Sequence, residues 1–294
     1  MPESISEKNS QVPKVIHYCW FGGNPLSELA INCIKSWRKF CPDYEIKEWN
    51  ESNFDVKSCT YVEEAYNAKK WAFVSDYARF WILYHEGGLY FDTDVEIIKS
   101  LEELIDKGPF MGCELALSNT NHYSTLTTIH GDEIGVNPGL GLCAYPNMKL
   151  YKIILDFYEH KHFINKDGSN DLTTVVQYTT SILLKDGFCA VDDIQYVDGV
   201  YIYPKDYFCP INYITGEINI TDNTKSIHHY NSSWKTKKEQ KQSITLQKLN
   251  RKFGKRWGFL FGRIYTLPYR VMEKYKYKGF WGTIKFAIAK LNHK

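Results

Sequence analysis

The chain lacks several features that mark common classes of protein. Its 294 residues contain no apolar run of the roughly 18 residues that a membrane-spanning helix needs. Its eight cysteines form no CxxC pair, and no secretory signal precedes them, so we expect reduced thiols in a cytoplasmic protein. No internal repeat is visible. These absences argue against a membrane-spanning protein, a disulfide-stapled domain, a zinc site and a repeat array.

Acidic residues are scarce in one part of the chain. Residues 235–294 hold 17 Lys and Arg against 2 Asp and Glu, whereas residues 1–234 hold 19 against 32. The formal charges are therefore +15 and −13, which together give the net +2 of the chain. Such a split is typical of an interaction tail. We expect a globular domain over residues 1–240 and a basic, aromatic-rich helical tail over residues 241–294.

What the sequence does contain is sufficient for a large hydrophobic core. Hydrophobic residues make up 44% and aromatic residues 16%, which excludes disorder. The patterns predict strands over 14–23, 45–50 and 89–97, separated by helices over 27–44 and 61–88. The order β-α-β-α-β predicts an α/β sheet with crossover helices. Ligands of such sheets bind beyond the carboxyl ends of the strands.

The rest of the globular domain is less regular. Further strands are expected over 109–116 and 139–146 and, as an edge strand because prolines interrupt it, over 200–211. Further helices are expected over 100–105, 148–163 and 172–187.

An aspartate pair ends one of these strands, in "GGLYFDTDVEI" at residues 87–97. In an extended chain residues i and i+2 point to the same side, so Asp92 and Asp94 are expected to aim into one cavity. Paired carboxylates suit Mg²⁺ or Mn²⁺. One alternative is a solvated surface turn. Another is a phosphatase with an aspartate nucleophile, although Glu96 stands where such enzymes carry Thr or Val.

Four further features carry polar or aromatic groups near predicted strand ends. Trp20 follows the first strand in "WFGG", where its ring suits stacking on a nucleobase or burial in the core. Asp76 and Arg79 share a helical face, as donor contacts or as an intrahelical ion pair. "HHYNSSW" at 228–234 and Asn137 in "GVNPGLG" are the remaining two.

The order of these segments resembles a known family. "IHYCWFGG" at 16–23, "WAFVSDYARFWILYHEGGLYFDTDVEI" at 71–97 and "HHYNSSW" are similar to glycosyltransferase family 32, whose members share a DXD sugar-binding region. The family includes fungal mannosyltransferases and bacterial capsular polysaccharide enzymes, and the glucosyltransferase domains of clostridial toxins are distant relatives. The resemblance implies a GT-A fold, a Rossmann-like mixed sheet flanked by helices, here with a basic helical extension.

The resemblance also implies roles for individual residues. Those implied for the metal, Mn²⁺ or Mg²⁺, are Asp94, His229 and Asp92. Those implied for the nucleotide-sugar donor are Cys19, Trp20, Phe21, Asp76, Arg79, Asp92, Ser232 and Trp234. Those implied for catalysis are Asp92, Asp94, Arg79 and Asn137. A Thr-Gly-Pro motif of many members is absent, since the comparable stretch reads "LTTVVQYTTSI".

The function that follows from the resemblance is sugar transfer with retention of configuration. We expect a UDP-sugar donor, a glycan acceptor that can be lipid-linked, and a role in bacterial surface polysaccharide synthesis. A toxin-like transferase that modifies a protein and a non-catalytic nucleotide-sugar-binding protein are the alternatives. Attack from the front face of the sugar is favoured, because no carboxylate is placed by the sequence as a covalent nucleophile.

The basic tail predicts where the protein acts. Residues 248–294 mix Lys and Arg with Trp, Phe, Tyr, Ile and Leu, a composition suited to anionic membrane surfaces. We expect peripheral association with the inner face of the cell membrane and no binding to nucleic acid. Docking of the tail on the acidic globular domain is the alternative.

Overall fold

The structure is a computed structural model that describes residues 11–116, 128–129, 132–212, 215–231, 238, 240–254, 257–258 and 260–268. The chain divides into two compact units. The first runs to Ile211 and resumes over Asn219–Trp234, and the second comprises Asn212–Ile218 and the chain from Lys235 onward. Among the described residues, no helix combines the length and apolar character needed to cross a membrane. The predicted boundary at residue 240 stays a prediction.

In the described part of the first unit, nine strands form one mixed sheet, in which β2, β1, β3, β8, β5, β10 and β9 lie in that order, β7 pairs with β5, and β6 pairs with β7. Their bounds are β1 (Val15–Cys19), β2 (Glu45–Trp49), β3 (Gly88–Tyr90), β5 (Phe110–Ala116), β6 (Thr128–Ile129), β7 (Asp132–Asn137), β8 (Leu142–Ala144), β9 (Gln195–Val197) and β10 (Val200–Tyr203). A second, two-stranded sheet pairs β4 (Val95–Ile97) with β11 (Ser226–His228).

Strand direction decides which ends of the strands meet. β1 pairs in parallel with β2 and with β3, and β10 pairs in parallel with β5. β8 is antiparallel to both β3 and β5, so β3 and β5 run the same way. The carboxyl ends of β1, β3 and β5 therefore lie at one edge of the sheet.

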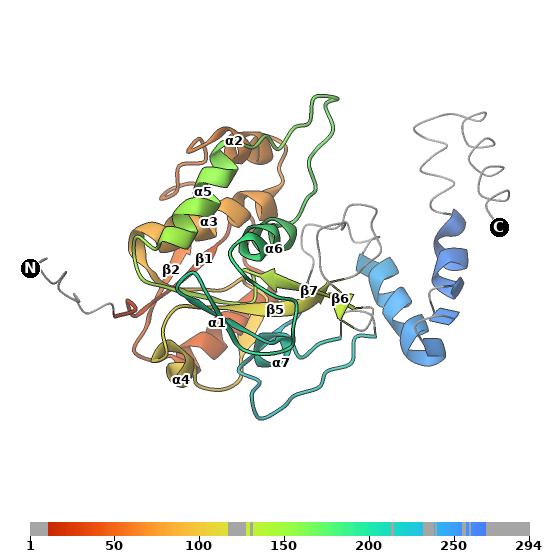
Figure 1. Ribbon diagram of the computed structural model, residues 1–294. Helices are drawn as coiled ribbons and strands as arrows, with labels where there is room; N and C mark the ends of the chain where they lie inside the picture. Colours follow the sequence, from red (N-terminus) through yellow and green to blue (C-terminus); the bar gives the residue numbers. More distant parts are fainter. Residues whose placement is uncertain are drawn as a thin grey trace, which may run out of the picture. The chain divides into compact units, whose positions relative to one another are not determined.

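Helices cover both faces of this sheet. They are α1 (Glu28–Phe40), α2 (Thr60–Asn67), α3 (Trp71–Glu86), α4 (Glu102–Ile105), α5 (Lys149–Glu159), α6 (Val175–Lys185) and α7 (Lys205–Phe208). One buried cluster joins the sheet to α2, α3, α5 and α6, and the other joins it to α1, α4 and α7. Figure 1 shows these groups on opposite sides of the strands. The predicted α/β class, a mixed sheet flanked by helices, is confirmed.

Local signals in the sequence explain the ends of several helices. The Ser27 hydroxyl caps α1 by accepting a hydrogen bond from the Ala30 N–H at 3.1 Å. Thr174 and Gln177 form a reciprocal capping box at the start of α6. Gly87 ends α3 with φ of 67°, and Gly88 follows with φ of 93°. A Cβ on Gly88 would lie 2.6 Å from the Val15 carbonyl oxygen, so this turn between helix and strand requires glycine.

Two predicted strands differ from the structure. The segment 89–97 is not one strand, because β3 ends at Tyr90 and β4 leaves to pair with β11. The segment 200–211 is not an edge strand: β10 is paired on both sides, Pro204 follows it, and α7 comes next. The edge position belongs to β9, which has no distinctive sequence pattern.

The second unit is described over fewer residues. Residues 240–254 are helical, and so are the described residues from 257 to 268. Several large apolar side chains of this unit are exposed; they are Ile244, Phe253, Trp257, Leu260, Phe261, Ile264 and Leu267. The five of these that run from Trp257 to Leu267 are three or four positions apart or adjacent, a spacing that places them along one side of a helix.

Candidate metal-binding site

The aspartate pair lies in a turn at the carboxyl end of β3. The Val95 N–H donates to the Asp92 carbonyl at 3.0 Å, and the Asp92 N–H donates to the Gly139 carbonyl at 3.2 Å. The chain therefore bends between the two carboxylates instead of staying extended. The expectation that alternation in a strand aligns Asp92 and Asp94 is wrong, although their side chains do converge.

Three potential ligand atoms meet in this turn. One atom each from Asp92, Asp94 and His228 lie within 4.8 Å of one another. His228 Nε2 is 3.1 Å from Asp94 Oδ1, and the Asn231 N–H donates to Asp94 Oδ2 at 2.8 Å. The aspartates come from the turn after β3, and His228 comes from β11, so the cluster joins segments more than 130 positions apart in the sequence.

The neighbouring histidine lies elsewhere. His229 Nε2 is 2.9 Å from Glu96 Oε2, outside the cluster. Successive residues of a strand point to opposite sides, and β11 pairs His228 with Val95. The sequence predicted His229 as a metal ligand, but the structure brings His228 to Asp92 and Asp94. A double histidine gives no signal that distinguishes the two before the register of β11 is known.

Arg79 connects the cluster to α3. Its Nη2 is 2.9 Å from Asp76 Oδ1 and 3.3 Å from Asp92 Oδ1, and its guanidinium lies over the Tyr90 ring. The Arg79 side chain is 3% exposed, and its buried Nη1 has no hydrogen-bond partner. A buried guanidinium nitrogen without a partner is costly, so this atom is available to an anionic or hydroxyl-bearing ligand.

The site is a coupled set of charges. Burial would lower the pKa of His228, but the neighbouring Asp94 and Asp92 raise it to about 9, so without a cation its imidazolium is charged at neutral pH. Burial would raise the pKa of Asp94, but the charge and hydrogen bond of His228 lower it to about 2.

The other carboxylates of the set shift the opposite way. Burial raises the pKa of Asp92, with Arg79 opposing, and burial raises the pKa of Asp76 to about 7, again with Arg79 opposing. Positive charge therefore meets the buried carboxylates from two sides, as Arg79 and as His228.

Asn137 lies beside the cluster at the end of β7. Its Oδ1 accepts the Gly139 N–H at 2.7 Å, and its Nδ2 donates to Glu114 Oε2 at 2.8 Å. The Tyr230 hydroxyl donates to the same Glu114 oxygen at 2.7 Å. The sequence did not single out Glu114, Gly139 or Tyr230. No motif surrounds Glu114, which reaches Asn137 through the pairing of β5 with β7. Gly139 and Tyr230 lie inside two of the quoted segments, but nothing in the sequence distinguishes them from their neighbours.

The last residue of β1 and the residues that follow it lie at the same edge of the sheet. Cys19 and Phe21 are buried, and burial raises the pKa of the Cys19 thiol to about 12. Trp20 is half-buried and donates its indole N–H to the Asn24 carbonyl at 2.6 Å. The donor roles of these three residues stay predictions. Ser232 and Trp234 lie outside the described residues.

The donor atoms present suit a divalent cation of the Mg²⁺ or Mn²⁺ class. Two carboxylates and one imidazole converge, and His228 Nδ1 is buried without a partner. Carboxylate oxygens suit both ions, and an added imidazole favours Mn²⁺ over Mg²⁺. Gly139 keeps space for this set, because a Cβ there would lie 2.2 Å from Asp92 Oδ2.

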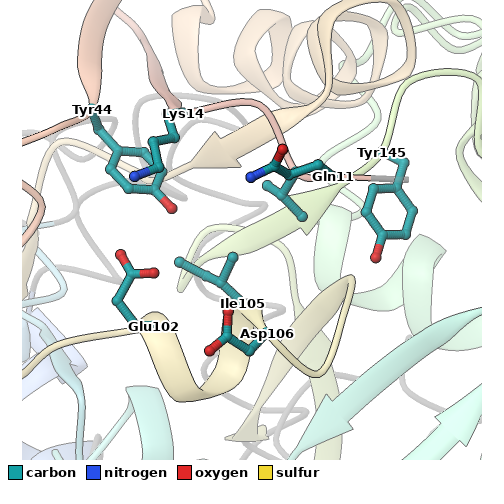
Figure 2. A pocket seen from close by; sticks show the side chains of 8 residues that line it. Gln11, Lys14, Tyr44, Glu102, Ile105, Asp106 and Tyr145 are labelled. Atoms are coloured by element: carbon teal, nitrogen blue, oxygen red, sulfur yellow. The ribbon is translucent and has the colours of Figure 1, made fainter. Parts of the chain in front are cut away.

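A cavity of about 400 Å³ lies away from this cluster, at the amino ends of β1 and β2. Figure 2 shows its lining side chains, which are Gln11, Val12, Lys14, Tyr44, Glu102, Ile105, Asp106 and Tyr145. None of the residues predicted for the site lines this cavity.

The family model that matches this chain covers a segment that contains both aspartates of the cluster but not His228. Residues 27–111 match the family described as "Glycosyltransferase sugar-binding region containing DXD motif". Inositol phosphoceramide mannosyltransferases 3 and 1 of Schizosaccharomyces pombe are each 30% identical to this chain, over 111 and 112 residues. Those matches cover 35% and 34% of this chain but only 30% and 34% of the yeast proteins, so the chain spans about a third of their length.

Other similarities are longer and weaker. An uncharacterized glycosyltransferase of Acanthamoeba polyphaga mimivirus is 24% identical over 218 residues, which cover 68% of this chain and 77% of the viral protein. Among solved structures, the PaToxG glycosyltransferase has a TM-score of 0.43 over 60% of this chain and 70% of its own. The galactosyltransferase LgtC, in complex with donor and acceptor sugar analogues, has a TM-score of 0.42 over 74% and 88%. Both are 17% identical to this chain.

Proposed function

We propose that this chain is a metal-dependent glycosyltransferase of the GT-A type and of family 32. It would move a sugar from a nucleotide-sugar, with a UDP-sugar favoured, to a glycan acceptor. The observation that carries the proposal is the convergence of Asp92, Asp94 and His228 within 4.8 Å at the carboxyl edge of the sheet. The match to a DXD sugar-binding region covers both aspartates and supports the same reading.

The cluster defines what the residues would do. Asp92, Asp94 and His228 would hold the cation, which when bound offsets the negative charge of a diphosphate leaving group. Arg79 is held by Asp76 and Asp92 and offers its unpartnered Nη1 to donor oxygens. Because Arg79 is fixed from two sides, it needs little reorganisation as charge develops on the leaving group.

The stereochemical outcome proposed is retention. Glu114 is a carboxylate in direct contact with Asn137, but its Oε2 already accepts two hydrogen bonds, from Asn137 and Tyr230. Two donors on one oxygen reduce its nucleophilicity. We therefore favour attack by the acceptor from the front face, with the departing phosphate taking the acceptor's proton, over a covalent glycosyl-enzyme.

The donor test is a screen of sugar nucleotides. The yeast relatives are mannosyltransferases by name, so GDP-mannose belongs in the screen beside UDP-glucose, UDP-galactose and UDP-N-acetylhexosamines. Release of nucleoside diphosphate is measured with Mn²⁺, with Mg²⁺ and with EDTA. Cation-dependent turnover of at least one donor supports the proposal, and full turnover in EDTA contradicts it.

The second unit supports a membrane location for this activity. Trp257, Phe261 and Ile264 are exposed at helical spacing, in a segment rich in Lys and Arg. An apolar stripe with surrounding cations suits the interface of an anionic bilayer. We propose that the protein lies at the inner face of a bacterial cell membrane and elongates a surface polysaccharide on a lipid-linked acceptor.

The membrane proposal is tested with the full-length protein. Trp257→Glu and Ile264→Glu should each reduce co-sedimentation with vesicles that contain 30% phosphatidylglycerol, by about tenfold, since a charge would replace an exposed apolar group that enters the bilayer interface. Lys14→Gln, in the first unit, lowers the net charge by one unit as these variants do and is the control for net charge. Equal binding by all four proteins would contradict the membrane proposal without affecting the proposed activity.

A further inference from the structure

A carboxylate that belongs to no motif joins the two halves of the candidate metal site. Glu114 lies on β5, near the carboxyl edge of the sheet, and is half-buried. Its Oε2 accepts the Asn137 Nδ2–H at 2.8 Å and the Tyr230 hydroxyl at 2.7 Å. Asn137 contacts Gly139, which contacts Asp92, and the Tyr230 ring packs against the His228 ring.

The first branch fixes Asp92. With its Nδ2 held by Glu114, Asn137 presents its Oδ1 to the Gly139 N–H at 2.7 Å. The Gly139 carbonyl accepts the Asp92 N–H at 3.2 Å, and the Gly139 Cα packs directly against the Asp92 carboxylate. Glu114 therefore determines, through two further residues, where Asp92 enters the cluster.

The second branch fixes His228 and the turn after it. Tyr230 has φ of 51°, a left-handed conformation that bulky side chains rarely adopt without other support. The support includes the hydrogen bond to Glu114, a contact with Cys209 Sγ at 2.8 Å and packing of the Tyr230 ring 4.4 Å from the His228 ring.

The same turn wraps around Asp94. The His229 N–H donates to the Asp94 carbonyl at 2.9 Å, and the Asn231 N–H donates to Asp94 Oδ2 at 2.8 Å. The bond from Asn231 depends on the direction that the chain takes at Tyr230, and the bond from His229 continues the pairing of β11 with β4 up to that residue. Holding the Tyr230 hydroxyl thus keeps His228 and Asn231 on Asp94.

We propose that Glu114 is a positioning residue that holds Asp92 and His228 in register, acting through Asn137 on one side and Tyr230 on the other. It is not placed as a ligand or a nucleophile. The proposal rests on the proposed function only where it assigns the cluster to a cation, and the hydrogen-bond arrangement itself needs no cation. Hydrogen-bond acceptance by residue 114, not its charge, is the property that matters.

The first measurement uses the full-length protein without metal. Amide hydrogen exchange is followed in the peptide that contains His229 and Asn231, at a temperature where each variant is folded. Glu114→Leu and Tyr230→Phe each remove the bond, and we expect exchange at least about tenfold faster, since these amides lose the turn that protects them. Glu114→Gln should stay within about threefold of wild type, because its amide oxygen can accept both hydrogen bonds.

A matched control changes another glutamate that contacts the segment after β11 but lies outside the cluster. Glu96 contacts His229 at 2.9 Å, so Glu96→Gln tests whether any glutamate near this turn has the same effect. It should leave exchange unchanged. Wild-type exchange rates in both Glu114→Leu and Tyr230→Phe would overturn the proposal, and so would equal acceleration in Glu114→Gln and Glu114→Leu.

The second measurement is Mn²⁺ affinity by electron paramagnetic resonance. Residues that support metal ligands commonly change affinity 10- to 100-fold, and we expect about tenfold weaker binding in Glu114→Leu and Tyr230→Phe. The double variant should lose no more than Glu114→Leu alone, because Glu114→Leu already removes the hydrogen bond that the Tyr230 hydroxyl donates. Unchanged affinity in both single variants would overturn the positioning role while leaving the proposed function intact. Absent Mn²⁺ binding in wild type, together with faster exchange in Glu114→Leu, would sink the cation assignment but support the positioning role.

Discussion

Carboxylates lie at both edges of the central sheet, and the two edges differ in what those carboxylates contact. At the carboxyl edge, Asp92, Asp94 and Arg79 contact one another or His228 and are mostly buried. At the amino edge, Glu102 and Asp106 face a cavity of about 400 Å³, and their carboxylates form no hydrogen bond or ion pair within the part of the chain that the structure describes. The comparison teaches that convergent charge, not open volume, marks the candidate site here.

The largest difference between the edges should appear in turnover. Asp94→Ala removes a proposed cation ligand and the partner of His228, and it should lower donor turnover by about 10³-fold or more. Asp106→Asn, at the cavity, should leave turnover near wild type. Nucleoside diphosphate release measures both, and far-ultraviolet circular dichroism checks that both are folded. Near wild-type turnover in Asp94→Ala would show that the site is misassigned.

Stability should separate the buried charges from an exposed pair. Arg79→Ala leaves Asp76 and Asp92 buried without their cation, which should cost about 3–5 kcal/mol in the free energy of unfolding. Lys47→Ala breaks a half-exposed pair with Glu86 and should cost less than about 1 kcal/mol. Urea unfolding measures both. Equal losses would mean that Arg79 is no more than an ordinary intrahelical ion pair.

The close packing at the carboxyl edge gives a third test. In Gly139→Ala the new Cβ would meet Asp92 Oδ2 at 2.2 Å, so the carboxylate must move. We expect about tenfold weaker Mn²⁺ binding, while the melting temperature measured without metal should change little. Calorimetric titration with Mn²⁺ checks it. Wild-type affinity would mean that Asp92 tolerates displacement and is not a fixed ligand.

His17, a buried histidine of β1, predicts a pH effect on the free energy of unfolding. His17 accepts from the Trp49 indole N–H at 3.0 Å and lies 3.0 Å from the Gly87 carbonyl, and burial lowers the pKa of His17 to about 4. Between pH 6.5 and 4 the unfolded chain binds a proton that the folded chain does not, so stability falls as the pH falls through that window. The loss at pH 5 should be about 2 kcal/mol relative to pH 7.5.

His17→Gln provides the comparison for that pH effect. Glutamine places an amide near the Gly87 carbonyl but does not titrate, so the variant should lack the His17 part of the pH dependence. Urea unfolding at pH 7.5, 6.0 and 5.0 compares the two proteins. Parallel curves would show that His17 does not supply the effect.

The smallest effect is expected at the cavity. Tyr145→Ala and Glu102→Gln change its lining without touching the aspartate turn, and donor turnover should stay within about twofold of wild type. A large loss in either variant would mean that the amino edge takes part in catalysis and that the contrast between the edges is wrong.

Sequence patterns predicted the parts of this molecule that depend on local order. Hydrophobic spacing predicted the first three parallel strands and their helices, and the placement of Trp20 and Asp92 at neighbouring strand ends follows from the α/β rule. Register is not a local property. The choice of His228 over His229 depends on the pairing of β11 with β4.

Non-local pairing also hid part of the site. Glu114 reaches Asn137 only because β5 pairs antiparallel with β7, a strand that the sequence pattern did not reveal. The turn at Asp92 forms because its N–H bonds to the Gly139 carbonyl instead of a strand partner. Tertiary contacts override the local preference for an extended chain at such positions.

The most direct test of the site is the Mn²⁺ affinity of two histidine variants. His228→Ala removes the imidazole that lies 3.1 Å from Asp94, whereas His229→Ala removes one that lies 2.9 Å from Glu96. Calorimetric titration should show binding at least about tenfold weaker in His228→Ala and close to wild type in His229→Ala. Loss of affinity in His229→Ala with normal affinity in His228→Ala would contradict the assignment of Asp92, Asp94 and His228 as the metal site.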